Sequence, residues 1–206
     1  MKLQVALDRL ERDECFELLE ETKASVDWIE VGTGVIKEFG MAIVREIKVS
    51  YPSHTIVADM KTCDAGKHEA KQAFEAGADI VTVMAFSADQ TIKDTLNVAQ
   101  QYNKRIMIDL LGVTDKKRIV ELENLGVDLV SLHFGKDMQQ EKEMSTNLFD
   151  LVNEASNFEV AVAGGINEHS LPDIVKHNPN IVIVGSAITS ADNPKDVSLK
   201  LKGMIN

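Results

Sequence analysis

The sequence has few cysteines and no long hydrophobic run. Only two of its 206 residues are cysteine, Cys15 and Cys63, and their spacing is not that of a metal site or a disulfide framework. We expect both to be free thiols in a reducing compartment. No stretch reaches the roughly 18 apolar residues that cross a bilayer, and the apolar start before Asp8 is too short for a signal peptide. These absences predict a cytoplasmic protein without a membrane segment.

Basic residues are also scarce. The chain has 22 Lys and Arg against 33 Asp and Glu, a formal net charge of −11. This balance argues against broad binding of nucleic acid or anionic lipid, because both require clustered positive charge. It leaves room for one small anionic substrate, since backbone N–H groups, a single lysine or a bound metal ion act locally. With 44% hydrophobic and 27% charged residues, the chain is predicted to be one compact domain, residues 1–206.

Short β-branched runs alternate with longer helical patterns from one end of the chain to the other. This alternation is typical of parallel βα units. The runs recur at regular intervals, which favours a closed (β/α)8 TIM barrel over an open doubly wound sheet. The expected strands are Leu3–Leu7, Trp28–Val31, Thr55–Ala58, Ile80–Met84, Arg105–Asp109, Leu129–His133, Val160–Ala163 and Ile181–Val184.

Glycines mark the ends of two expected helices. The turns at Ala76–Asp79 and Leu125–Asp128 carry a glycine in the position of a helix C-cap, directly before a strand. The glycine of Phe39–Met41 lies instead among apolar residues at helical spacing, so we expect one helix to run through it.

Acidic and basic residues gather at the expected strand ends, where barrel enzymes build their sites. The densest group is Asp59-x-Lys61 followed by Asp64 in the next loop. At strand pitch the first two side chains point the same way, so the ammonium can face developing negative charge. An ordinary ion pair is the plainer alternative. Glu30 ends the preceding strand and can join Asp59 as an oxygen ligand of Mg²⁺, although two carboxylates alone are a weak metal signal.

Two glycine turns follow the last two expected strands. Gly164 and Gly165 come after the seventh, and Gly185 and Ser186 after the eighth. Such turns expose backbone N–H groups beside helix starts, and barrels often place a phosphate between these two loops. The pattern therefore predicts a phosphate site.

Two more strand ends carry ionisable residues. His133 ends the sixth strand and is suited to move a proton near neutral pH. Asp8 ends the first. An acid after a strand often caps the next helix instead, but several such residues at one rim favour a catalytic site.

The chain resembles the orotidine 5′-monophosphate decarboxylase superfamily over essentially its whole length. The likeness rests on Asp59-x-Lys61-x-x-Asp64, on Asp8, His133 and Glu30 in Glu-Val-Gly-Thr, and on an Ala-Gly-Gly-Ile turn. It implies Mg²⁺ held by the carboxylates of residues 30 and 59, and a 1,2-enediolate steadied by the lysine. Asp8 and Asp64 would fix hydroxyls and protons, and His133 or Asp64 would carry the proton. It further implies substrate binding by Thr33, Gly164, Gly165, Gly185 and Ser186, and a homodimer in which Asp64 reaches the neighbouring site.

Within this superfamily the resemblance favours the 3-hexulose-6-phosphate synthase branch, which joins ribulose 5-phosphate to formaldehyde, over the 3-keto-L-gulonate-6-phosphate decarboxylases. The decarboxylases typically continue the strand-six histidine as His-x-x-Arg-Asp and carry an arginine in the last phosphate loop. This chain has Lys136 and Ser186 there, and lysine does not replace the arginine fork. A decarboxylase, a metal-independent sugar-phosphate epimerase and a barrel that binds a sugar phosphate without turnover remain alternatives.

Overall fold

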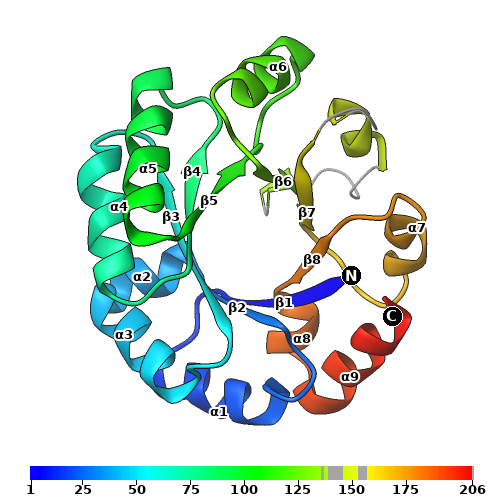
Figure 1. Ribbon diagram of the computed structural model, residues 1–206. Coiled ribbons are helices and arrows are strands. Elements are labelled where there is room, and N and C mark those ends of the chain that lie inside the picture. Colours follow the sequence, from blue (N-terminus) through cyan, green and yellow to red (C-terminus); the bar gives the residue numbers. More distant parts are fainter. Residues whose placement is uncertain (136, 139–145, 153–156, 206) are drawn as a thin grey trace.

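Eight parallel strands close into a barrel in the order of the chain in this computed structural model (Figure 1). The structure describes residues 1–135, 137–138, 146–152 and 157–205. The strands are β1 (Lys2–Leu7), β2 (Trp28–Val31), β3 (Thr55–Thr62), β4 (Ile80–Met84), β5 (Arg105–Asp109), β6 (Leu129–His133), β7 (Glu159–Ala163) and β8 (Ile181–Val184). The closed barrel predicted from the regular spacing is confirmed.

Helices surround the barrel and connect successive strands (Figure 1). They are α1 (Arg12–Thr22), α2 (Thr33–Phe39), α3 (Met41–Ser50), α4 (Gly66–Glu75), α5 (Asp89–Tyr102), α6 (Lys116–Asn124), the 3-10 helix η2 (Thr146–Leu151), α7 (Leu171–Val175), α8 (Ser186–Thr189) and α9 (Pro194–Met204). None of the helices in the described ranges is long and apolar enough to span a membrane.

One expected helix is divided in two. The prediction of a continuous helix through Phe39–Met41 is wrong, because Gly40 has a φ of 64° and separates α2 from α3. A positive φ is accessible to glycine at little cost, so the chain can turn there without losing the apolar spacing on either side. The capping glycines predicted at Ala76–Asp79 and Leu125–Asp128 do have positive φ, 100° at Gly77 and 88° at Gly126.

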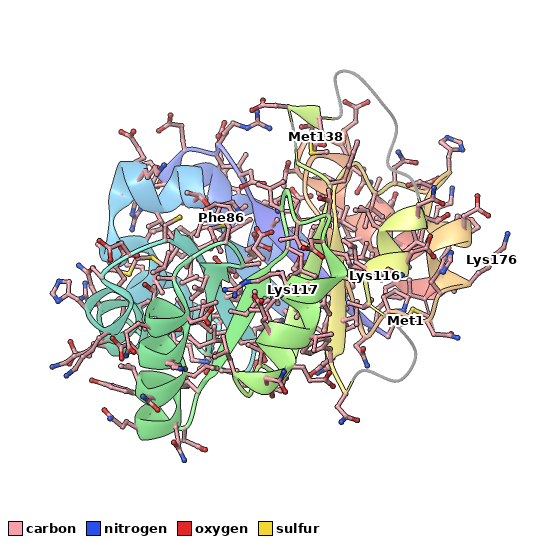
Figure 2. All side chains as sticks on the ribbon, turned by 90° about the horizontal axis from the view of Figure 1, so that it is seen from above. Met1, Phe86, Lys116, Lys117, Met138 and Lys176 are labelled. Carbon is pink, nitrogen blue, oxygen red and sulfur yellow. The ribbon has the colours of Figure 1, made fainter. Side chains whose placement is uncertain are left out.

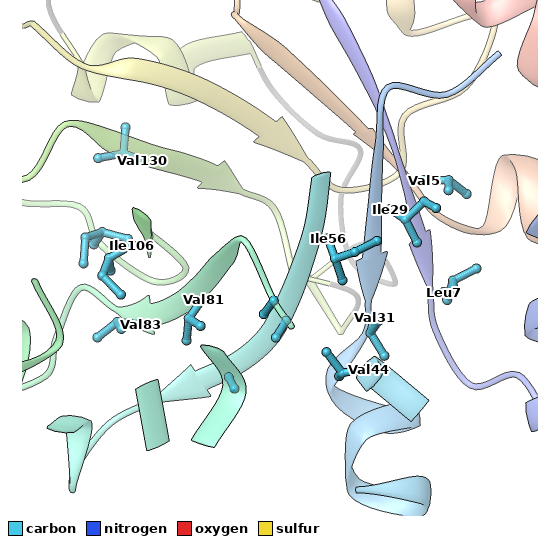
Figure 3. Close-up of a cluster of buried hydrophobic side chains, with 14 of the residues drawn as sticks. Val5, Leu7, Ile29, Val31, Val44, Ile56, Val81, Val83, Ile106 and Val130 are labelled. Atoms are coloured by element: carbon cyan, nitrogen blue, oxygen red, sulfur yellow. The ribbon is translucent and has the colours of Figure 1, made fainter. Parts of the chain in front are cut away.

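Outward-facing strand residues and the apolar faces of the helices form the main hydrophobic core. Its members include Val5, Ile29, Ile56, Val81 and Ile106, all fully buried or nearly so (Figure 3). Because the strands are covered by helices outside and by side chains inside, they read as continuous apolar runs. Burial on both faces explains why five of the eight strand ranges match their predicted bounds.

Inward-facing residues fill the barrel and separate its two ends. A second apolar cluster includes Trp28, Val57, Met107, Leu129 and Ile181. At the amino-terminal end of the strands, the guanidinium of Arg105 pairs with a carboxylate oxygen of Glu159 at 2.6 Å. The opposite end is lined by the ionisable strand-end residues. Figure 2 shows Met1 and Met138 toward these opposite ends. The packed interior therefore leaves one open, polar mouth.

Candidate active site

A cavity of about 800 Å³ opens at the carboxyl ends of the strands. It gathers ten of the eleven predicted site residues: Asp8, Glu30, Thr33, Asp59, Lys61, His133, Gly164, Gly165, Gly185 and Ser186. They come from the ends of six strands that are distant in sequence and brought together by the closed barrel. The structure thus brings the predicted carboxylates, the lysine and the glycine turns to one cavity.

Asp64 does not line this cavity. It is exposed in the loop between β3 and α4 and borders a separate surface hollow, together with residues from the starts of α4 and α5. Within one chain it therefore lies apart from the residues with which it was predicted to act. The part of the predicted role that depends on a second copy of the chain stays a prediction.

An irregularity in β3 directs Lys61 into the cavity. The pairing of β3 with β4 shifts register between Ala58 and Thr62, and Lys61 has a φ of 47°. Its backbone N–H donates to Oγ1 of Thr82 at 2.9 Å, which supports this unusual conformation. A left-handed conformation at a non-glycine residue stores strain that is typical of functional sites. The side chain is thereby placed beside Asp59, which lies within the same irregular stretch.

Asp59 is held by three side chains. Lys61 Nζ lies 2.9 Å from its Oδ2, Thr82 Oγ1 donates to Oδ1 at 2.8 Å, and Thr33 Oγ1 donates to Oδ2 at 2.7 Å. The residue is only 4% exposed. Thr33, predicted to bind substrate, therefore uses its hydroxyl to orient a carboxylate. Thr82 was not predicted; its signal in the sequence is only a polar residue within the apolar run of β4.

Asp109 joins the lysine to the histidine. Its Oδ2 lies 3.0 Å from Lys61 Nζ and 2.8 Å from His133 Nδ1. Burial raises the pKa of Asp109, but the hydrogen bond and charge of His133 and the charge of Lys61 outweigh burial, so the pKa lies below its ordinary value. The sequence prediction omitted this residue, although its position at the end of β5 was the available signal.

Lys61 stays protonated within this group. Burial by itself lowers the pKa of its ammonium, but the carboxylates of Asp59 and Asp109 outweigh burial and raise it above its ordinary value. A fixed positive charge in a partly buried mouth is the arrangement that stabilises developing negative charge on a substrate.

For the carboxyl groups of Glu30 and Asp8, burial and nearby negative charge outweigh the positive charge of Lys61. Burial, followed by the charges of Asp59 and Asp8, raises the pKa of Glu30 well above its ordinary value. Burial of its carboxylate and the charge of Asp59 raise the pKa of Asp8, although this residue is exposed toward the cavity opening. The mouth therefore holds more negative charge than Lys61 neutralises.

That excess charge fits a hard cation between Glu30 and Asp59. Both residues offer carboxylate oxygens, the ligands preferred by Mg²⁺, and a bound cation would compensate the charge that raises the pKa of Glu30. No group of three or more His, Cys, Asp and Glu side chains converges as a ligand set in the described part of the chain. The fit is thus to a cation that keeps several of its waters, as Mg²⁺ commonly does.

The two glycine turns face the same cavity. Gly164 has a φ of 117°, and a Cβ built there would lie 2.2 Å from the carbonyl oxygen of Phe134, so the backbone approaches too closely for any side chain. Gly185 precedes the short helix α8. No acceptor among the described residues pairs with the backbone N–H groups of Gly165 and Ser186. N–H groups from two turns at one cavity, without acceptors in the described part of the chain, suit an anion.

Comparison with known proteins agrees with this geometry. Residues 1–201 match the model of the Orotidine 5'-phosphate decarboxylase / HUMPS family. The 3-hexulose-6-phosphate synthase of Bacillus subtilis (strain 168) is 39% identical over 207 residues, covering 100% of this chain and 99% of the relative.

Solved structures give the same assignment. The 3-hexulose-6-phosphate synthase from Salmonella typhimurium is 34% identical with a TM-score of 0.96, covering 100% of this chain and 98% of that one. The 3-keto-L-gulonate-6-phosphate decarboxylase from Vibrio cholerae is 28% identical with a TM-score of 0.88, covering 99% and 96%. The chain therefore belongs to the orotidine 5'-phosphate decarboxylase / HUMPS family, as an enzyme of the 3-hexulose-6-phosphate synthase type.

Proposed function

We propose that the enzyme uses Mg²⁺ to condense ribulose 5-phosphate with formaldehyde, giving 3-hexulose 6-phosphate in a reversible reaction. The observation that carries this proposal is the chain of contacts from Asp59 through Lys61 and Asp109 to His133, in the same cavity as two glycine turns. It combines a fixed ammonium, a group able to transfer a proton and an anion site, all of which this reaction requires.

The glycine turns would hold the phosphate. The N–H groups of Gly165 and Ser186 supply hydrogen bonds without a side-chain charge, and Gly164 and Gly185 keep the backbone close to the anion. With the phosphate there, the opposite end of the sugar extends toward the carboxylates of β2 and β3. Substrate length and cavity position thus favour a pose in which the first two carbons lie near Lys61.

The cation would be held by Glu30 and Asp59, with Asp8 beside them. When bound, Mg²⁺ would supply positive charge that stabilises negative charge developing on the sugar oxygens. Thr33 and Thr82 hold the carboxylate of Asp59 in position. Lys61 would have to give up one of its contacts with this carboxylate when a cation binds, because it approaches both oxygens.

The reaction balances with one proton removed and one returned. A base takes a proton from the first carbon, and the electron pair left behind forms the new carbon–carbon bond to formaldehyde. The aldehyde oxygen then receives a proton. Lys61 stabilises the charge on the sugar oxygens in between. We assign His133 as the proton carrier, with Asp64 of a second copy of the chain as the alternative. We also expect the enzyme to be a homodimer.

The decarboxylase alternative is less well supported. The decarboxylase from Vibrio cholerae is 28% identical to this chain, whereas the synthase of Bacillus subtilis reaches 39%. Ser186 lines the cavity where the resemblance places an arginine in the decarboxylases. Lys136, the other departure from the decarboxylase pattern, lies outside the described residues.

Activity with the two candidate substrates tests the proposal. Purified protein should consume formaldehyde in the presence of ribulose 5-phosphate, lose this activity in EDTA and regain it with Mg²⁺. Lys61→Met should reduce kcat by about 10²–10³-fold, by analogy with the loss of one stabilising donor. Release of CO₂ from 3-keto-L-gulonate 6-phosphate without formaldehyde consumption would favour the decarboxylase instead. Full activity in EDTA would contradict the proposed requirement for Mg²⁺.

A further inference from the structure

Gln4 is a polar residue inside an otherwise apolar part of the barrel. It lies on β1 in register with Trp28 of β2 and with Ile183 of β8, both of which face inward. Its exposed fraction is 0%. The apolar interior cluster surrounding this level of the barrel is made of Ala6, Trp28, Val57, Ile80, Met107, Leu129, Ala161, Ile181 and Ile183. Packing alone would favour an apolar side chain at position 4.

The amide of Gln4 is only half satisfied. Its Nε2 donates to Oε2 of Glu30 at 2.5 Å, while its Oε1 is buried and has no hydrogen-bond partner in the described structure. A buried acceptor without a partner destabilises the folded state. The unpaired Oε1 of Gln4 therefore lowers the stability of the fold, while Nε2 of the same amide donates a hydrogen bond to Glu30.

Glu30 depends on this single contact. Gln4 provides the one hydrogen bond that its carboxylate accepts from the described residues, whereas Asp59 accepts from Thr33, Thr82 and Lys61. A neutral amide has no charge that would compete with a cation for the carboxylate. It fixes Oε2 from below, in the barrel interior, and leaves Oε1 of Glu30 available at the cavity.

We propose that Gln4 is a positioning residue that holds Glu30 for the divalent cation. This inference rests on the proposed function, because it assumes that Glu30 is a metal ligand. Removal of an outer partner of a metal ligand typically weakens metal binding by about 10–100-fold. The same removal at position 4 eliminates the unpaired Oε1 but also the donor to Oε2 of Glu30, so the two effects on stability oppose each other.

Mn²⁺ binding to the protein without substrate tests this role. Gln4→Met has a similar volume and no hydrogen-bonding amide. Titration with Mn²⁺, followed by the electron paramagnetic resonance signal of the free ion, should give a dissociation constant about 10–100-fold above that of the wild-type protein. The Tm without metal checks that the variant remains folded. Thr95→Val, which removes a fully buried hydroxyl on α5 outside the cavity lining, is the control and should bind Mn²⁺ as the wild type does.

The outcomes separate the two proposals. A folded Gln4→Met protein with wild-type affinity for Mn²⁺ would overturn the role of Gln4 and leave the proposed function intact. A lower Tm together with unchanged affinity would show a purely structural role. If the wild-type protein itself bound no Mn²⁺, the metal of the proposed function would be wrong. Gln4→Leu provides a second apolar variant should methionine fail to fold.

Discussion

Nδ1 of His133 lies 2.8 Å from Oδ2 of Asp109. An ionised carboxylate can only accept, so Nδ1 carries the proton and Nε2 is the nitrogen left for the substrate. The same carboxylate oxygen lies 3.0 Å from Lys61. Asp109 therefore fixes the tautomer of the histidine and the direction of the ammonium at once.

Asp109→Asn should reduce kcat by about 10²–10³-fold, because the amide can present either an acceptor or a donor to Nδ1 and no longer specifies the tautomer. The KM for ribulose 5-phosphate should change much less, since the phosphate turns are untouched. Steady-state kinetics separates the two effects. A rise in KM with unchanged kcat would contradict the positioning role, and a thermal melt checks that the variant remains folded.

Glu30→Gln should stabilise the metal-free protein at neutral pH. The pKa of Glu30 is raised by burial and by nearby carboxylates, so its ionisation in the folded state costs free energy once the pH exceeds the ordinary value of 4.5. Below that pH the residue is protonated in both states, and wild type and variant should melt alike. As the pH rises through the raised pKa, the wild-type protein loses stability and the glutamine variant does not.

Melting curves measured in EDTA from about pH 4 to about pH 8 check this, because the range spans the ordinary pKa of a glutamate. Each kcal/mol should shift Tm by about 2–4 °C in a chain of this size. Added Mg²⁺ should raise the Tm of the wild-type protein and not that of the variant, because ligand binding stabilises only the state that binds. If the Tm of Glu30→Gln differed from that of the wild-type protein by the same amount at the lowest and the highest pH, ionisation of Glu30 would be ruled out as the cause.

Alanine at the two phosphate turns should have different effects. Gly164→Ala places a Cβ at 2.2 Å from the backbone of Phe134 with a φ of 117°, so it should lower Tm and activity together. Gly185→Ala has its nearest contact at 3.6 Å, to Asp8, and should fold normally but raise KM for the sugar phosphate. Gly203→Ala, which meets nothing within 4 Å, is the control and should gain about 0.5–1 kcal/mol. Equal melting of the first two variants would contradict this assignment.

Arg9→Gln should raise KM for ribulose 5-phosphate. Arg9 lines the same cavity as the two glycine turns, so its positive charge can attract an anionic substrate. A hydrogen bond to a charged group contributes about 1.5–3 kcal/mol, so its loss should raise KM by about 10-fold or more. Arg12→Gln is the matched control, because Arg12 is paired with Glu46 outside the cavity. Kinetics at low and high salt should show a weaker salt dependence for Arg9→Gln.

The fold could be predicted because its signals are local. Each strand is covered on both faces, so its run of apolar residues is visible without knowing its neighbours, and the bounds of β2, β4, β5, β6 and β8 match. The division between α2 and α3 was missed, since Gly40 sits within a continuous helical pattern. The spacing of apolar residues does not reveal that a single residue has a positive φ.

Local patterns in the chain predict the barrel, the polar strand ends and the positions of the two glycine turns, because strand period and turn chemistry depend on neighbouring residues. Which of these residues touch depends on the three-dimensional packing of the strands. The register shift in β3 directs Lys61 to Asp59 and Asp109, and the register of β1 against β2 places Gln4 next to Glu30. Both depend on pairing between strands. Contacts of that kind are set by the packing of the whole barrel and leave no periodic trace in the chain.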